Sequence, residues 1–417
     1  MSAPALAAVW AGTGLVAAGV LPLLRLRALG FLVPLAGLVA ALLVTLGGTE
    51  VPGAGLAGDL AIDRVAQGLL VVGAAGIAWV LLLQPVLEAA QLRTVGLVAA
   101  GVVVALSTGN ALVWAVALFG AMSVLALRWI ATAPGRASFA SGRVALPGGA
   151  TLIAAAPFLP IALIAGPRPI ASAALLGCGI AAVVGLLPLG GWAAAVVTTQ
   201  AAADVAAWCL LLGPGVLLTA DRLQATMPPL ALVYFEGILT VLGLTTAAWQ
   251  ALQALRLRGR ARYARVLLAD LALVAAAVGT GRAAQALPAL LLIVVTHVIT
   301  APVLLQAADV SPRAARLIWL LLCGLPPGPS FWGRLLVVEA LTQSTFWGVV
   351  VALGVMAALF AASVLSALRI THSPQSAAPG GRVRSAVVES GAWSLLAGGL
   401  AAGVAPGAAV AFLFGLH

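Results

Sequence analysis

Apolar runs of about 20 residues follow one another along almost the whole chain, separated by short loops that carry arginine. A bilayer core about 30 Å thick needs about 20 apolar residues for each spanning helix. Hydrophobic residues make up 63% of the 417 residues and charged residues only 8%, which is more apolar surface than a water-soluble core can bury. The sequence therefore predicts an all-α polytopic membrane protein, with residues 1–417 forming a single transmembrane domain.

Marking the apolar runs predicts about 14 transmembrane helices. The first run has no basic segment before it and no clear small-residue cleavage site, so we expect a retained helix rather than a signal peptide. The approximate spans are 4–22, 29–47, 63–84, 94–108, 110–130, 147–166, 170–189, 199–219, 229–252, 265–281, 286–306, 317–341, 345–368 and 390–414.

The arginines are divided unequally between the two sets of loops. The loops after spans 1, 3, 5, 9, 11 and 13 hold most of them, including the dense block Leu255–Arg265. The positive-inside rule then places both termini on the non-cytoplasmic side. The block either touches lipid headgroups or a partner subunit, or simply anchors the topology. Because the net charge of +10 is spread over loops instead of one soluble face, the sequence does not indicate nucleic-acid binding.

Two predicted helices are broken by proline and glycine. GLLPLGGW, with Pro188, ends span 7, and GLPPGPSFWGR, with Pro326 and Pro327, interrupts span 12. A broken helix is tolerated in lipid only where protein or a wet cavity satisfies the freed backbone groups, and breaks in two corresponding halves point to a transport path. The breaks lie five spans apart. This spacing predicts two inverted five-helix repeats, about 94–222 and 229–370, flanked by helices 1–3 and 14.

Five ionisable residues inside the spans are candidates for a polar core: Glu236, Asp270, His297, Arg334 and Glu339. Charges in a membrane are costly, so each is a functional candidate with a partner to be found. His297 titrates nearest neutral pH and either relays protons or makes a structural interhelical hydrogen bond. Arg334 stays charged and is expected to pair with Glu236 or Asp270, since Glu339 points about 140° away on the same helix. A fixed pair would be structural, and a pair that opens could gate.

Motifs for enzymatic chemistry are absent from the sequence. It has no Walker loop, HExxH or GxSxG, and its three cysteines have no spacing for a metal, an iron-sulfur cluster or haem. We therefore expect no metal and no cofactor. All 21 basic residues counted as lysine or arginine are arginine, which does not deprotonate as a buried lysine can.

The segment GLPPGPSFWGR and the apolar helix after it resemble the Gly-Leu-Pro-Pro, Gly-Phe-hydrophobic-Gly-Lys stretch on the broken twelfth helix of antiporter-like subunits. These are the proton-pumping membrane subunits of respiratory complex I, membrane-bound hydrogenases and Mrp-type antiporters. Other segments are similar in the same order, so the resemblance covers nearly the whole chain and favours the compact N or D type. The additional segments are Ala61–Leu82, Pro188–Trp192, Leu291–Val310 and Gly403–Leu413.

The resemblance implies a bacterial cytoplasmic (inner) membrane protein with other membrane subunits as partners, either antiporter-like or from a quinone or hydrogenase module. It implies no cofactor here, since redox chemistry belongs to neighbouring subunits. It also implies a proton path through acidic and lysine positions on helices 5, 7, 8, 11 and 12. Only His297 and Arg334 keep polar identities on that path. Its other positions fall on Gly120, Val183, Pro214 and Ala301.

Three functions follow from these observations. The chain is a subunit of an ion-translocating complex with an impaired or altered proton channel and a scaffold or coupling role, or a subunit that still pumps by other groups. Alternatively, it is a stand-alone secondary transporter for an ion or small anion attracted to Arg334. The loss of four path positions together argues against the pumping form, because a proton wire needs titratable groups along its length.

Overall fold

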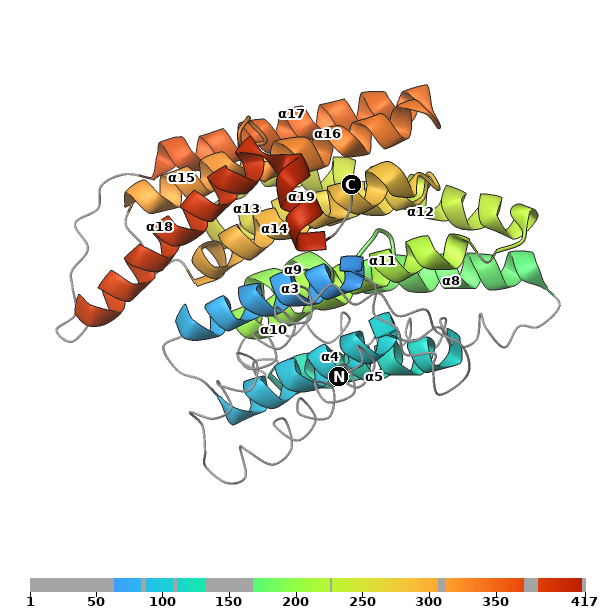
Figure 1. Cartoon of the computed structure of the whole chain (residues 1–417), viewed down its shortest axis with the longest axis horizontal. Coiled ribbons are helices and arrows are strands. Elements are labelled where there is room, and N and C mark those ends of the chain that lie inside the picture. The colour runs from blue at the N-terminus through green and yellow to red at the C-terminus, as the bar shows by residue number, and fades with distance from the viewer. Residues whose placement is uncertain are drawn as a thin grey trace.

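The computed structural model describes residues 64–83, 88–107, 111–132, 168–225, 227–306, 312–370 and 382–414, and all regular elements in these ranges are helices (Figure 1). The predicted spans 4–22, 29–47 and 147–166 lie outside them. In chain order the helices are α3 (Arg64–Leu83), α4 (Ala89–Ser107), α5 (Ala111–Thr132), α8 (Pro169–Val184), α9 (Ala193–Thr199), α10 (Ala202–Ala206), the π-helix η1 (Ala207–Leu212), α11 (Gly213–Gln224), α12 (Pro229–Arg256), α13 (Gly259–Val278), α14 (Ala283–Gln306), α15 (Pro312–Leu322), α16 (Pro329–Thr342), α17 (Phe346–Arg369), α18 (Arg382–Val404) and α19 (Pro406–Phe414).

Four helical segments in the described ranges are long and apolar enough to cross a membrane by themselves. They are Ala202–Gln224, Pro229–Arg256, Ala283–Leu305 and Phe346–Arg369. Shorter apolar helices accompany them, and most helices run nearly parallel to one another (Figure 1). This arrangement confirms a multi-pass helical membrane protein.

Helix α13 lies at the centre of the bundle. It packs against α12, α14, α9, α16 and α17, and from Val266 to Val278 every residue is buried. Helices α12 and α17 instead expose apolar side chains such as Val241, Leu252 and Leu368. An apolar outer face is what a helix presents to lipid, since lipid tails are as apolar as leucine.

The two predicted helix breaks are present, and they share a local geometry. Helix α8 ends at Gly185, whose φ is 86°, and α15 ends shortly before Gly324, whose φ is 79°. Positive φ favours glycine because it has no Cβ. In each break a proline with a cis peptide bond follows three residues later, at Pro188 and at Pro327.

The chain continues past each break as a second helix. For span 7 this corrects the expectation that Gly185–Trp192 ends the span, since α9 extends it to Thr199. The reason is local: one left-handed residue and a short turn interrupt the hydrogen-bond ladder, and the three alanines after Trp192 favour helix. Span 12 is interrupted as predicted, with α15 before the break and α16 after it.

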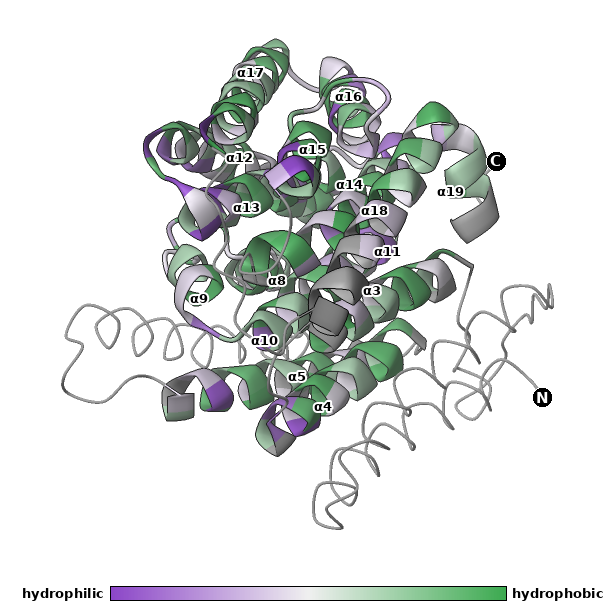
Figure 2. Cartoon of the chain, turned by 90° about the vertical axis from the view of Figure 1, so that its left-hand side faces the viewer, coloured by the Kyte–Doolittle hydropathy of each residue, from purple (hydrophilic) through white to green (hydrophobic). Residues whose placement is uncertain are grey.

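Charged and polar residues gather at one end of the bundle. Figure 2 looks at this end, and hydrophilic colour marks the ends of α4 and α5 and the turn between α12 and α13. The turn contains exposed Arg256 and Arg258. We call this the arginine-rich end.

Candidate functional site: a buried ion pair between the central helices

Arg334 on α16 and Asp270 on α13 form a buried bidentate ion pair. The Arg334 Nε donates to Asp270 Oδ1 at 2.8 Å, and its Nη2 donates to Oδ2 at 2.9 Å. Both side chains are only 1% exposed. Two parallel hydrogen bonds between a guanidinium and a carboxylate are the strongest arrangement available to this pair. Of the two carboxylates expected to pair with Arg334, Asp270 is therefore the partner.

His297 and Tyr263 extend this pair into a network. His297 on α14 lies 3.2 Å from Asp270 Oδ2 through its Nε2, and its Nδ1 lies 3.4 Å from the Tyr263 hydroxyl. A consistent proton arrangement has the Tyr263 O–H donating to Nδ1 and the Nε2–H donating to Asp270. All four groups are buried, so the network is a polar cluster within the apolar core.

The break before α16 lies against the guanidinium. A Cβ built on Gly324 would lie 2.7 Å from Arg334 Nη1, and Nη1 itself is buried without a hydrogen-bond partner among the described residues. The absence of a side chain at Gly324 thus leaves room for the arginine. Beyond the break, the Trp332 indole donates to the Gly403 carbonyl at 2.8 Å, which joins α16 to α18. Pro326 and Pro327 are exposed in the break itself.

Glu236 and Glu339 do not join this cluster. Glu236 is half-buried on α12, where its carboxylate lies close to Gly281 beyond the end of α13. Glu339 is exposed and accepts a hydrogen bond from Gln285 at 3.4 Å. Both residues lie inside predicted spans, but Glu236 lies beside Gly281, beyond the end of α13, and Glu339 is exposed at the surface.

Apolar groups surround two of the positions at which the resemblance expects titratable residues. Val183 is fully buried, and its carbonyl accepts the Trp208 indole N–H at 2.9 Å. Trp208 belongs to a stack of three tryptophans with centroid distances of 5.5 and 5.3 Å, which we call the tryptophan stack: Trp129, Trp192 and Trp208. Pro214 is buried just after the π-helix η1.

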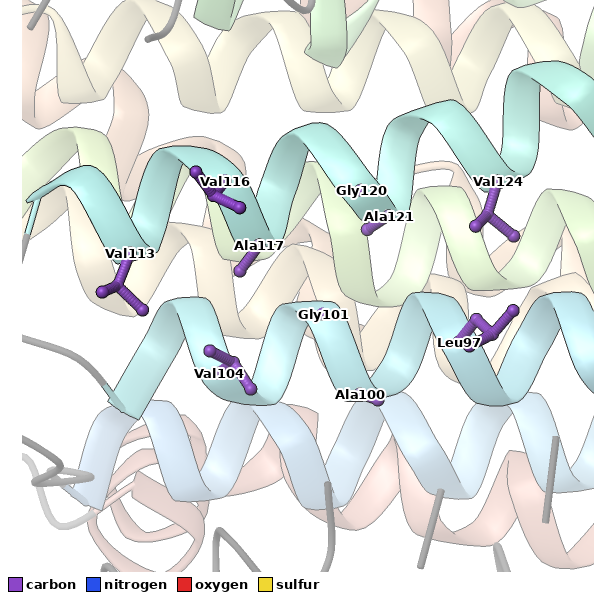
Figure 3. Close-up of a pocket in the computed structure, with 10 residues that line it drawn as sticks. All are labelled: Leu97, Ala100, Gly101, Val104, Val113, Val116, Ala117, Gly120, Ala121 and Val124. Atoms are coloured by element: carbon purple, nitrogen blue, oxygen red, sulfur yellow. The ribbon is translucent and has the colours of Figure 1, made fainter. Parts of the chain in front are cut away.

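Gly120 and Ala301 are apolar positions as well. Ala301 is buried on α14. Gly120 lies on an open groove of about 510 Å³ between α4 and α5, lined by small and aliphatic residues only (Figure 3). None of the four substituted positions therefore supplies an ionisable group to the interior.

Three polar residues that the sequence reasoning did not single out take part in buried interactions. Tyr263 is one, and Arg128 and Asp204 are the others, with Arg128 Nε 3.4 Å from Asp204 Oδ2. Arg128 lies inside an apolar span and Asp204 near the start of one, so the rule that flags intramembrane charges covers them too. Tyr263 has no such signal, because a tyrosine near the end of a span is common.

The fold and the buried pair together define a polytopic membrane protein with a charged interior site. No family model matches the sequence, and no curated protein matches it. Solved structures do match. A chain of respiratory complex I from Thermus thermophilus with bound aureothin is 22% identical, with a TM-score of 0.74, covering 96% of this chain and 98% of that one.

Two further solved chains have the same fold. One belongs to the membrane-bound sulfane sulfur reductase, an archaeal respiratory membrane complex, at 16% identity and a TM-score of 0.76, covering 98% of this chain and 96% of that one. The other belongs to the Mrp complex from Dietzia sp. DQ12-45-1b, at 18% identity and a TM-score of 0.77, covering 100% of this chain and 97% of that one. The resemblance seen in the sequence is thus confirmed as a shared fold.

Proposed function

We propose that this chain is a membrane subunit of a multi-subunit ion-translocating complex with an altered proton channel and a scaffold or coupling role. The observation that carries the proposal is a contrast between two regions of one fold. The C-terminal half has a buried bidentate ion pair between Asp270 and Arg334, whereas the N-terminal half has Val183 and the tryptophan stack at its corresponding broken helix.

The fold supports the assignment to a complex. The three solved chains with this fold come from respiratory complex I, a sulfane sulfur reductase and an Mrp complex, and each is matched over nearly its full length. We infer other membrane subunits as partners, together with lipid on the apolar faces of α12 and α17. We also propose the bacterial inner membrane, with both termini on the non-cytoplasmic side.

The finer architecture belongs to the same proposal. We infer about 14 spans and two inverted repeats, about 94–222 and 229–370. The matching positive-φ glycines at Gly185 and Gly324, each three residues before a proline, support the repeat.

The ion pair between Asp270 and Arg334 favours a fixed ionic site rather than a complete path for proton transfer. Arg334 cannot deprotonate, and its two hydrogen bonds hold Asp270 in the charged form. A path through the cluster would have to use His297 and water, since Val183, Pro214 and Ala301 carry no ionisable group.

The test is purification of the tagged chain in mild detergent, with mass spectrometry of the proteins that co-purify. Proton flux is then compared in vesicles that contain the complex with His297→Ala, Arg334→Ala or the exposed control Glu339→Gln. We expect co-purifying membrane subunits and flux that responds no more to His297→Ala than to the control. A chain that purifies alone overturns the assignment to a complex. Flux abolished by His297→Ala alone means that the chain still moves protons through this cluster, which overturns the scaffold role.

A further inference from the structure

A second arginine–carboxylate group lies at the arginine-rich end, between α5, α10 and the start of α4. Arg128 Nη2 lies 2.7 Å from Glu88 Oε2, and Arg128 Nε lies 3.4 Å from Asp204 Oδ2. One guanidinium is thus divided between two carboxylates. We call this group the Arg128 triad: Glu88, Arg128 and Asp204.

The Arg128 triad differs from the central pair in how completely its buried acid is bonded. Both oxygens of Asp270 accept hydrogen bonds, and the two from Arg334 are 2.9 Å or shorter. Asp204 has one long contact to Arg128, and its Oδ1 is buried with no hydrogen-bond partner in the described residues. An unsatisfied charged oxygen in an apolar interior is costly. Protonation would relieve this cost at Asp204, whereas both oxygens of Asp270 are already hydrogen-bonded.

The three side chains of the Arg128 triad also differ in their exposure to solvent. The side chain of Glu88 is 57% exposed, that of Arg128 is 14% exposed and that of Asp204 is 1% exposed. An exposed ion pair contributes about 0–1 kcal/mol, so Glu88 holds Arg128 only weakly. The guanidinium can therefore leave the exposed acid at small cost in free energy, whereas leaving the buried acid requires that this acid take up a proton.

The backbone around Asp204 is irregular and is stabilised by hydrogen bonds from neighbouring side chains. Asp204 follows a helix interruption at Gln200 and precedes the π-helix η1, and π-helical turns are frequent at functional sites. Arg260 donates to the carbonyls of Val197 and Gln200, and Thr132 donates to the Gln200 side chain at 2.8 Å. The polar groups of Val197 and Gln200 near Asp204 are therefore hydrogen-bonded, while Asp204 Oδ1 is not.

We propose that Asp204 is a proton-binding site of this chain and that Arg128 controls it by moving between Asp204 and Glu88. When Arg128 bonds Glu88, Asp204 takes up a proton on its unpartnered oxygen. When Arg128 bonds Asp204 with both nitrogens, the proton leaves to water at the arginine-rich end. This proposal extends the coupling role proposed above and rests on it. Its test, however, requires neither a partner subunit nor a measurement of proton flux.

Among the described residues, few other charged groups lie near Asp204. Of the elements packed against α10, α9 has no ionisable side chain and η1 has only Cys209. Helix α14 carries His297, which bonds Asp270, while α4 carries the exposed Arg93 and α3 begins with Arg64. Arg128 and Glu88 are therefore the charges that act on Asp204 most directly.

The test is a pH titration of the purified full chain in detergent, followed by infrared spectroscopy of the protonated carboxyl C=O band. We expect a band that appears as the pH falls and is absent in Asp204→Asn. Glu88→Gln frees Arg128 for Asp204 and is expected to move the midpoint to lower pH by about one unit or more. Arg128→Gln is expected to move it to higher pH.

Glu339→Gln is the matched control, because Glu339 is exposed like Glu88 but lies away from the triad. It is expected to leave the Asp204 band unchanged. If Arg128→Gln does not fold, Glu88→Gln decides the question, since Glu88 is largely exposed. A band that persists in Asp204→Asn, or a midpoint that ignores Glu88→Gln, overturns the proposal. Either result leaves the membership of a complex untouched.

Discussion

Arg334 and Asp270 join α16 to α13 through two hydrogen bonds of 2.8 and 2.9 Å in the centre of an apolar bundle. Isolating either charge there is far costlier than keeping the pair, because water cannot reach the group that remains. The pair is therefore the best place to test how stability and function are related in this chain.

Replacing Arg334 by glutamine is expected to lower the free energy of unfolding by about 3–5 kcal/mol, because Asp270 would remain as an uncompensated buried charge. Thermal unfolding in detergent measures the loss. The double variant Arg334→Gln with Asp270→Asn should recover part of it, since no charge is then buried alone. Equal stability of the single and double variants would contradict the pair as a stabilising unit.

The substitution Arg334→Lys separates charge from geometry. Lysine keeps a positive charge but cannot bond both oxygens of Asp270 in a planar fork, so we expect a loss of about 2 kcal/mol, smaller than for glutamine. Unfolding in the same detergent compares the two variants. A lysine variant as unstable as the glutamine variant would mean that the shape of the guanidinium matters more than its charge.

Gly324→Ala should destabilise the chain by about 1–3 kcal/mol, because alanine is strained at a φ of 79°. Its Cβ would also lie 2.7 Å from Arg334 Nη1. Gly354→Ala is the matched control, since a Cβ there meets nothing within 4 Å. Similar melting temperatures for the two variants would show that the break tolerates a side chain.

Trp208→Ala tests the apolar interior around Val183 in the N-terminal half. The substitution removes the ring contact between Trp208 and Trp192 and the hydrogen bond to the Val183 carbonyl. The expected loss in the free energy of unfolding is about 3–5 kcal/mol. Proton flux through the folded protein should not increase, because the cavity left by the missing indole would still have an apolar side chain, Val183, where a proton path needs a titratable one. Increased proton flux would instead identify the stack as a barrier in a working path.

The sequence supplied the helical class, the two breaks and the candidates for the pairing of Arg334. These features follow from strong local signals: apolar length, proline and glycine in apolar runs, and intramembrane charge. The choice of Asp270 over Glu236 could not be made in the same way, because it depends on how α12 and α13 are placed against α16, which no local signal in the sequence reports. The continuation of span 7 into α9 was missed because a break and an end look alike in sequence.

The tryptophan stack and the Arg128 triad are harder to predict for a different reason. Trp129, Trp192 and Trp208 come from three separate parts of the chain, and Glu88, Arg128 and Asp204 do so as well. Their meeting is a property of tertiary packing, and no spacing along the chain reports it.

The contact between Trp332 and the Gly403 carbonyl has a consequence for biogenesis. Helix α16 ends at Thr342 and α18 starts 40 positions later, at Arg382, so α16 leaves the ribosome before α18 does. Gly403 lies near the end of α18 and follows later still. During that interval the break at Pro327 has no cover from α18, and the freed backbone groups must be satisfied by water or by an insertion factor. Membrane insertion of this chain therefore passes through a stage at which the helices that carry its ionic core have all been synthesised but α18 has not.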